Sequence, residues 1–158
     1  MKGKYLDKNE IAGWRETLRA EGKKLVVTNG CFDLLHVGHV RYLSQARALG
    51  DVLLVAVNSD HSVRQLKGMS RPVHPESDRA EVLSALTAVD HVTIFDEVRC
   101  ESILRTVQPD IYVKGGDYTV ETLDEGERGV LEEVGAKIRI LPLVPGRSTT
   151  NTIERMRS

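Results

Sequence analysis

Two short apolar segments with a helical pattern between them constrain this chain more than any other feature. Residues 25–28 form a β-branched run that ends at Asn29-Gly30, and residues 52–57 are all apolar. Between them, apolar residues recur at helical spacing over residues 40–49, and a glycine follows as a stop signal. The segment therefore predicts a strand, a helix and a second strand. Such a crossover in one parallel sheet is almost always right-handed, and it brings the ends of both strands to one edge.

The rest of the chain continues this alternation. Further strands are predicted at residues 91–95, 111–114 and 138–141, and further helices at 11–22, 75–87, around 103–107, at 121–134 and around Ile153. We expect an α/β fold, a Rossmann-like doubly wound five-stranded parallel sheet with helices on both faces. One domain is expected over residues 1–158, with a leading helix in 1–22 and the core in 23–158. We interpret the leading helix as structural, covering a sheet edge or a partner subunit.

The sequence also predicts which side chains of two helices are buried, exposed or capping. In the helix over 75–87, Val82, Leu83 and Leu86 are expected to face inward, whereas Arg79 is interpreted as a surface charge. Near the end of the chain, Asn151 and Glu154 have the spacing of a helix capping pair.

Composition excludes several classes of function. The 158 residues include 22 basic and 23 acidic side chains, so no bulk field favours nucleic acid or an anionic membrane. Cys31 and Cys100 are far apart and form no CxxC motif, which argues against a disulfide scaffold or a zinc knuckle. There is no signal peptide and no apolar run of membrane-spanning length, so we expect a cytoplasmic protein that binds no membrane.

The tetrad His36-Val37-Gly38-His39 lies where the first strand is followed by its helix. A helix start offers unpaired N–H groups and a positive dipole end, which favour phosphate. His36 and His39 are three residues apart and share one face of the first turn, and Gly38 lets a base or phosphate approach the backbone. The alternatives are a helix cap, surface histidines or a metal pair, although no further ligand lies at suitable spacing.

Three other segments are expected at the same edge. Residues 61–74 form a loop that carries Lys67 among other cations around a glycine, and we favour a phosphate-covering lid over a solvated charge run. Arg147 and Ser148-Thr149-Thr150 precede a second helix start, which suits either phosphate or simple capping. Two glycines follow the strand at 111–114 and suit either close approach to a ligand or a plain turn. If the crevice lies between the first and fourth strands, Gly116 and Asp117 lie opposite the tetrad.

The run from Thr28 to His39 resembles the signature of the cytidylyltransferase-like nucleotidyltransferases. Together with residues 113–118 and 141–151, it is similar to the heptose 1-phosphate adenylyltransferase branch. The resemblance implies transfer of AMP from ATP to a sugar 1-phosphate, giving ADP-heptose for lipopolysaccharide core. It also implies Mg²⁺, a stand-alone form with a separate sugar kinase, and a homodimer.

The resemblance also implies roles for individual residues. His36, His39 and Lys67 would be catalytic. The nucleotide would be bound by Asn29, Gly30, Cys31, Phe32, Gly38, Lys114, Gly116, Asp117, Arg147, Ser148, Thr149 and Thr150. Asp33 is the candidate magnesium ligand, with Asp117 as a second, unless Asp33 instead orients backbone near the glycine turn.

Two rival functions remain open. Glycerol-3-phosphate cytidylyltransferases usually carry Arg-Thr-Glu-Gly-Ile before Ser-Thr-Thr, whereas Leu143-Val144-Pro145-Gly146-Arg147 stands here and argues against CTP and glycerol phosphate. A nucleotide-binding regulator without turnover is the alternative from another class. The acidic segment 123–133 matches the family pattern poorly, and its role is open.

Overall fold

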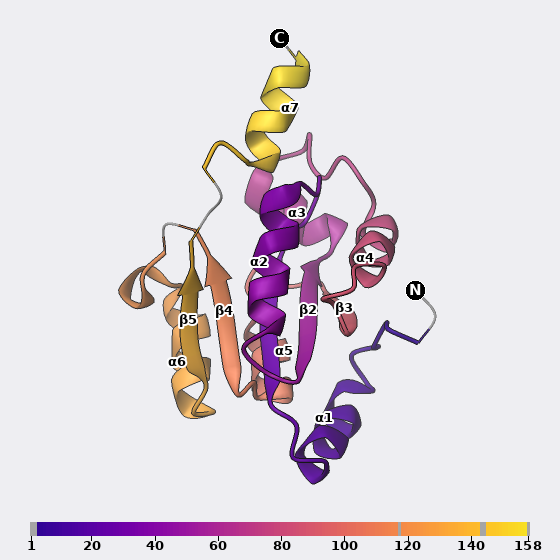
Figure 1. The fold of residues 1–158 in the computed structure, drawn as a ribbon. Coiled ribbons are helices and arrows are strands. Elements are labelled where there is room, and N and C mark those ends of the chain that lie inside the picture. Colours follow the sequence, from indigo (N-terminus) through magenta and orange to yellow (C-terminus); the bar gives the residue numbers. More distant parts are fainter. Residues whose placement is uncertain (1–2, 117, 143–144, 158) are drawn as a thin grey trace.

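A parallel five-stranded sheet forms the centre of the protein, in a computed structural model that describes residues 3–116, 118–142 and 145–157 (Figure 1). The strand order is β3-β2-β1-β4-β5, and every neighbouring pair is parallel. The strands are β1 (Leu25–Gly30), β2 (Val52–Asn58), β3 (His91–Phe95), β4 (Ile111–Gly115) and β5 (Lys137–Leu141). The α/β fold, the five strands and the neighbouring positions of β1 and β4 are confirmed.

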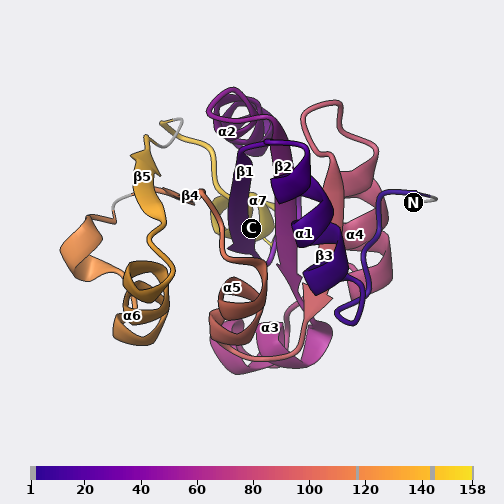
Figure 2. The same cartoon turned by 90° about the horizontal axis from the view of Figure 1, so that it is seen from below.

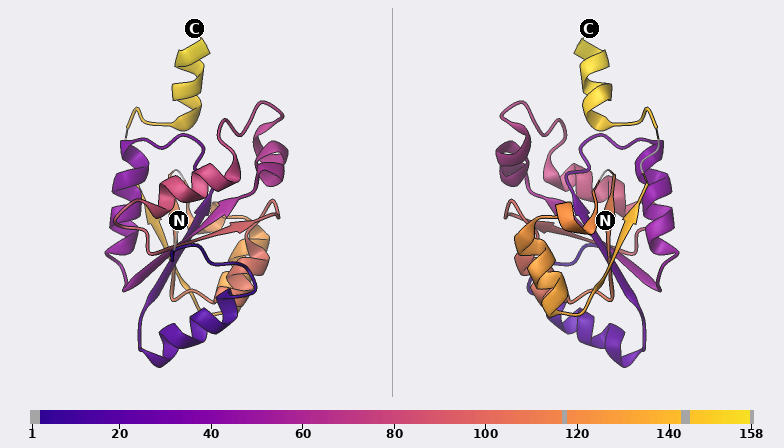
Figure 3. Two further views of the ribbon diagram at one scale, coloured as in Figure 1. Left: turned by 90° about the vertical axis from the view of Figure 1, so that its right-hand side faces the viewer. Right: turned by 90° about the vertical axis from the view of Figure 1, so that its left-hand side faces the viewer.

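Helices cover both faces of this sheet (Figures 2 and 3). The α-helices of the described chain are α1 (Ile11–Ala20), α2 (Val37–Arg47), α3 (Asp60–Lys67), α4 (Glu76–Ser84), α5 (Glu101–Val107), α6 (Glu125–Glu133) and α7 (Thr149–Arg157). On one face, α2 and α4 contribute Leu43 and Leu83 to a buried apolar cluster. On the other face, α1, α5 and α6 contribute to a second cluster. Burial of two faces explains why β2 is apolar from Val52 to Val57.

The leading helix has a different place from the one expected. Through Ile11 and Leu18, α1 packs into the cluster on one sheet face rather than covering an edge. The preceding residues meet the edge instead, because Tyr5 bridges Val92 and the Leu6 N–H donates to the Val92 carbonyl at 2.9 Å. The edge strand β3 is therefore partly paired by the protein's own chain, which limits strand addition there.

Other local predictions need correction. Residues 61–74 are not one loop, because α3 occupies the first half. The region 121–134 is divided into a 3₁₀ turn at Val120–Thr122 and α6. Val82 is exposed. The buried residues of the short helix α4 are Arg79, Ala80, Leu83 and Ser84.

At the end of the described chain, α7 extends away from the sheet (Figure 3), and none of its residues is buried. Asn151 lies inside α7, which begins at Thr149, and Ser148 supplies the cap in its place. Within the described residues, no helix combines the length and the apolar character needed to cross a bilayer.

Candidate active site

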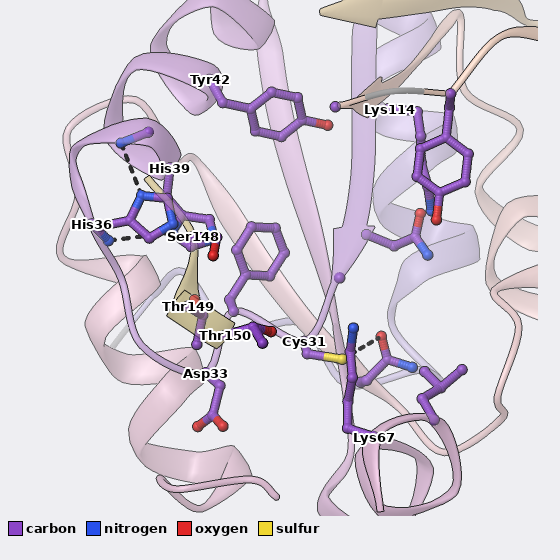
Figure 4. Close-up of a pocket in the computed structure, with 18 of the residues that line it drawn as sticks. Cys31, Asp33, His36, His39, Tyr42, Lys67, Lys114, Ser148, Thr149 and Thr150 are labelled. Carbon is purple, nitrogen blue, oxygen red and sulfur yellow. Dashed lines mark hydrogen bonds between the residues drawn. The ribbon is translucent and has the colours of Figure 1, made fainter. Parts of the chain in front are cut away.

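A cavity of about 450 Å³ opens at the carboxyl ends of the strands, between β1 and β4. Figure 4 shows His36, His39 and the segment Ser148–Thr150 on one side of it, Lys114 across from them and Lys67 below. Most of the predicted site residues line this cavity: Asn29, Gly30, Cys31, Phe32, Asp33, His36, Gly38, His39, Lys67, Lys114, Arg147, Ser148, Thr149 and Thr150. Segments more than a hundred residues apart in the sequence therefore meet where the strand order predicted.

The two histidines form the cap of α2. The His36 ring accepts a hydrogen bond at Nδ1 from the Gly38 N–H at 3.1 Å, and His39 Nδ1 accepts one from the His36 N–H at 3.2 Å. The ring centroids are 4.1 Å apart. Because both Nδ1 atoms accept, a neutral ring carries its proton on Nε2. The helix start thus offers an anion two imidazole donors in place of the backbone N–H groups that they cap.

Both imidazoles are kept neutral. Burial lowers the pKa of His39 to about 4, and the neighbouring His36 adds to this effect. Burial and the charge of Arg147 lower the pKa of His36 as well. At neutral pH both rings are therefore uncharged donors, so they give directed hydrogen bonds without the desolvation cost of a buried cation.

Gly38 has a different structural role from the one predicted. A Cβ at this position would lie 2.7 Å from His36 Cε1 and 2.8 Å from Nδ1. The imidazole ring therefore occupies the space that was expected to admit a base or phosphate. Gly38 allows the His36 ring to fold back onto the helix start.

Phe32 adds a strained position beside the tetrad. Its φ is +48°, in the left-handed region that bulky residues rarely adopt. The ring lies 5.6 Å from the His39 ring, centroid to centroid, and it would contact a Cβ at Gly30 at 3.0 Å. Strain of this kind persists where the surroundings hold it, commonly at functional sites. Here it directs the aromatic ring between β1 and His39.

The start of α7 is a second polar element of the cavity. Ser148 Oγ accepts from the Asn151 N–H at 2.9 Å, and Thr149 Oγ1 donates to the Leu34 carbonyl at 2.7 Å. The second bond ties α7 to the loop that precedes α2, so the two helix starts share one wall. Thr150 and Arg147 are exposed on that wall and are free to contact a ligand.

Cations face this wall from two other elements. Lys67 is the last residue of α3, and Lys114 lies near the end of β4 with its Nζ 5.1 Å from the centre of the Tyr118 ring. Cys31 lines the cavity beside Lys67 (Figure 4), and burial raises the pKa of its thiol. A thiol that stays protonated is a poor nucleophile, which agrees with chemistry that needs no covalent intermediate.

Asp33 does not have the surroundings expected of a magnesium ligand. Its side chain is fully buried, and its carboxylate accepts from Arg71 Nε at 2.7 Å and from the backbone N–H groups of Val73 and His74 at 2.9 and 3.0 Å. These bonds hold the pKa of Asp33 below 3.8, although burial alone would raise it. With both oxygens occupied, Asp33 anchors the loop after α3, and the carboxylate has no free lone pair directed at a metal.

Arg79 is a residue whose importance the sequence did not indicate. It is 2% exposed, not a surface charge. Its guanidinium donates to the carbonyls of Cys31, Asn58 and His74 at 2.7–2.9 Å and pairs with Asp60 at 2.9 Å. It therefore ties the ends of β1 and β2 to the loop before α4. Its spacing from Ala80 and Leu83, which also face the sheet, is the one signal that could have placed it inward.

The prediction that the glycines at the end of β4 lie at the ligand site is only partly met. Gly115 lines the cavity, whereas Gly116 is not among its lining residues. Gly116 has φ +100°, and its N–H donates to the Leu141 carbonyl at 3.1 Å, so it continues the pairing of β4 and β5. Asp117 lies outside the described residues, as do Leu143 and Val144.

The cavity also includes residues that the sequence did not single out: Tyr42, Asn58, Leu66, Arg71, Val98, Arg99, Tyr118, Glu127 and Pro142. Tyr42 follows His39 by three residues and so shares its helix face. Arg99 follows the end of β3, where a ligand-facing loop is expected. Glu127 had no such signal, since α6 was predicted only weakly.

The profile of the cytidylyltransferase-like family matches residues 27–155. The chain belongs to this family. It is a nucleotidyltransferase, and residues 27–155 contain both helix starts and all of the cavity side chains described above. The assignment to this family made from Thr28–His39 is confirmed.

The curated relatives are similar over most of this chain. It is 52% identical over 141 residues to the bifunctional protein HldE of Syntrophotalea carbinolica. This alignment covers 89% of the chain and 28% of that protein. It is 49% identical over 152 residues to HldE of a Nitratiruptor species, covering 96% and 32%. The chain thus spans about a third or less of the length of the curated relatives it matches.

Solved structures support the same assignment. A lipopolysaccharide core biosynthesis protein from Thermoplasma volcanium has a TM-score of 0.63 and 31% identity, over 78% of this chain and 98% of that one. The pantoate-β-alanine ligase of Francisella tularensis, solved with a β,γ-ATP ligand and β-alanine, has a TM-score of 0.59 at 14% identity. It covers 93% of this chain and 69% of that one, and it bears on the fold alone.

Proposed function

We propose that this nucleotidyltransferase transfers AMP from ATP to a sugar 1-phosphate, D-glycero-D-manno-heptose 1-phosphate, and releases ADP-heptose and pyrophosphate. One observation carries the proposal: two neutral imidazoles and the start of a second helix face one cavity that also holds Lys67 and Lys114. These groups suit a polyphosphate, since donors and cations approach it from several directions.

In the proposed reaction, an oxygen of the sugar phosphate attacks the α-phosphorus of ATP. A P–O bond forms there as the bond from the α-phosphorus to the bridging oxygen breaks, and pyrophosphate leaves with the electron pair. The attacking group is already an anion, so it needs no general base. Catalysis then depends on positioning and on stabilising charge.

His36 and His39 stabilise the leaving side of this reaction. Each has its Nδ1 committed to a backbone N–H and its Nε2–H available for phosphate oxygens. Donors fixed in this way need no reorganisation as charge develops on the pyrophosphate. Arg147 and the hydroxyl groups of Ser148 and Thr150 hold the β- and γ-phosphates beside them, and Lys67 approaches from α3.

Magnesium enters this proposal with the nucleotide. Asp33 is saturated by hydrogen bonds and does not suit the ion, so we assign no described residue to it. Phosphate oxygens and water supply the ligands that Mg²⁺ prefers in such sites. The residue roles above do not depend on a metal bound by the protein.

ATP and a heptose phosphate are favoured by the relatives. HldE proteins share about half of their aligned residues with this chain, and the solved relative from Thermoplasma is named for lipopolysaccharide core biosynthesis. We also propose that a sugar kinase activity supplies the 1-phosphate, and that the protein works as a cytoplasmic homodimer.

A pyrophosphate-release assay tests the proposal. ATP and CTP are each combined with heptose 1-phosphate, mannose 1-phosphate and glycerol 3-phosphate. We expect the fastest release from ATP with heptose 1-phosphate, together with ADP-heptose in the products. Faster turnover of CTP with glycerol 3-phosphate would replace the proposal by the cytidylyltransferase alternative. ATP binding without release in any combination would favour a regulator.

A further inference from the structure

Glu127 is a buried acidic side chain on the cavity wall that the reaction as described does not use. It lies in the first turn of α6, is 3% exposed and lines the cavity. Carboxylates are seldom buried without partners, because removing the charge from water is costly. One partner is the Cys100 N–H, which donates to Glu127 Oε1 at 2.9 Å. The acidic segment around α6 thus reaches the substrate cavity.

The same helical turn also holds the loop between β3 and α5. Asp124 caps α6 by accepting from the Glu127 N–H at 3.1 Å, and its carboxylate is 3.5 Å from Arg99 Nε. Val98 and Arg99 both line the cavity. Glu127 and the capping residue Asp124 therefore hold this loop against one side of the cavity.

Glu127 and the histidines approach the cavity from opposite faces of the sheet. Helix α2, which carries His39, belongs to the apolar cluster on one face, whereas α5 and α6 belong to the cluster on the other. The strand ends that carry Asn29 and Lys114 lie between them. The cavity thus has a histidine wall on one face and an α6 wall on the other.

The geometry of phosphoryl transfer assigns the α6 wall to the acceptor. Attacking and leaving oxygens lie roughly in line through the phosphorus in such reactions. If the histidine wall holds the departing pyrophosphate, then the acceptor reaches the α-phosphorus from the opposite side. The residues on that side are Arg99 and Glu127, and Lys114 reaches the cavity from the strand end between the two walls.

The chemistry of these side chains suits a ligand with many hydroxyl groups. Lys114 and Arg99 offer donors and positive charge to the acceptor phosphate. Glu127 can only accept, and it would repel a phosphate, so the part of the acceptor beside it must donate hydrogen bonds. Sugar hydroxyls do so, whereas a simple alkyl phosphate has no donors there.

We propose that Glu127 determines acceptor specificity by accepting hydrogen bonds from sugar hydroxyls of the bound 1-phosphate. This inference rests on the proposed function and adds a residue on α6 to it. The site would then recognise its acceptor in two parts, the phosphate by cations and the sugar by a carboxylate.

The variant E127Q separates this role from a structural one. Glutamine keeps an Oε1 that can accept from the Cys100 N–H, and it removes the charged acceptor. Glu125→Gln, at an exposed position on the same helix, is the matched control. We expect kcat/KM for heptose 1-phosphate to fall about 10- to 100-fold in E127Q, as for loss of a charged hydrogen bond. The KM for ATP and the melting temperature should stay unchanged, and E125Q should match the wild type.

Deoxygenated acceptors give a second readout. The wild type should discriminate against a heptose 1-phosphate analogue lacking the recognised hydroxyl, and E127Q should discriminate less. If the wild type turns over heptose 1-phosphate and E127Q is equally active on every acceptor, the role of Glu127 is wrong and the proposed function stands. A raised KM for ATP with an unchanged KM for the sugar phosphate would also overturn it, because Glu127 would then contact the ribose. A wild type without turnover on any sugar phosphate would overturn the proposed function itself.

Discussion

Asp33 and the histidines of the tetrad lie on one short loop and the first turn of α2, yet they use their polar groups in opposite ways. Asp33 accepts only from protein groups, from Arg71 and the backbone of Val73 and His74, and is fully buried. In His36 and His39, one ring nitrogen accepts a hydrogen bond from a backbone N–H, and the rest of the ring faces the cavity.

The same contrast holds between the buried ionic cluster beneath the cavity and the wall above it. In the cluster, Asp33 pairs with Arg71 and Asp60 pairs with Arg79. These charges are compensated within the protein, so they hold loops together. A charged residue inside a family signature is therefore not automatically a ligand of the substrate, and substitutions should divide into those that unfold and those that inactivate.

The largest effect is expected when Arg79 is replaced by methionine. The change leaves Asp60 without its partner and three carbonyls without a donor. Breaking a buried pair on one side typically costs about 3–5 kcal/mol. The free energy of unfolding, measured by denaturant titration, should fall by that amount. Arg64→Met on the exposed face of α3 is the control, and an equal effect of both substitutions would contradict the assigned role.

The next effect tests the histidine wall by activity. In H39N the asparagine oxygen can replace Nδ1 as acceptor for the His36 N–H, but no group replaces the Nε2 donor. Loss of one preorganised donor typically lowers kcat by about 10²- to 10³-fold. Pyrophosphate release should fall by this factor at an unchanged melting temperature, and H39A should lose stability as well.

His61→Asn, at an exposed position on α3, is the matched control for H39N. It should retain wild-type turnover. Near-normal pyrophosphate release by H39N would remove His39 from the reaction and leave it a helix cap, the alternative that its position at a helix start allowed.

A smaller effect is expected from Asp33→Asn. The amide keeps one acceptor oxygen for the loop but loses the ion pair with Arg71. We expect a loss of about 1–3 kcal/mol in the free energy of unfolding. Asp78→Asn, exposed on α4, should be neutral. The magnesium dependence of turnover should be unchanged in D33N, and a shift of that dependence would restore Asp33 as a metal ligand.

The sequence predicted the sheet because its signals were local and strong. The apolar runs of β1 and β2 and the stop at Gly50 left few alternatives, and the right-handed crossover rule then placed the strand ends together. The site followed from the same rule, since two helix starts at one edge must lie near each other. The resemblance of Thr28–His39 to a known signature supplied the chemistry.

What the sequence could not predict depends on contacts between distant segments. Arg79 was interpreted as a surface charge because its four partners belong to separate loops and strands. Asp33 was considered for magnesium because nothing local shows that residues 71–74 would surround it. Glu127 lay in a weakly periodic helix, and only the packing of α6 against α5 brings it to the cavity.

A dependence of stability on pH separates His39 from Asp33. The pKa of His39 is about 4 when folded and 6.5 ordinarily, so between these values the unfolded chain binds a proton that the folded chain does not. The free energy of unfolding should therefore decrease as pH falls from 6.5 toward 4.

Asp33 contributes in a lower window. Its pKa is held below 3.8 in the folded protein, so its stabilisation is lost only as pH falls through that range. The slope of the unfolding free energy against pH reports how many protons the chain takes up on unfolding. Between pH 6.5 and 4 this number should fall by up to about one in H39N and stay unchanged in D33N. Denaturant titrations at a series of pH values measure both slopes. An unchanged slope in H39N would mean that His39 is not buried in neutral form, and its role as an uncharged donor would be lost with it.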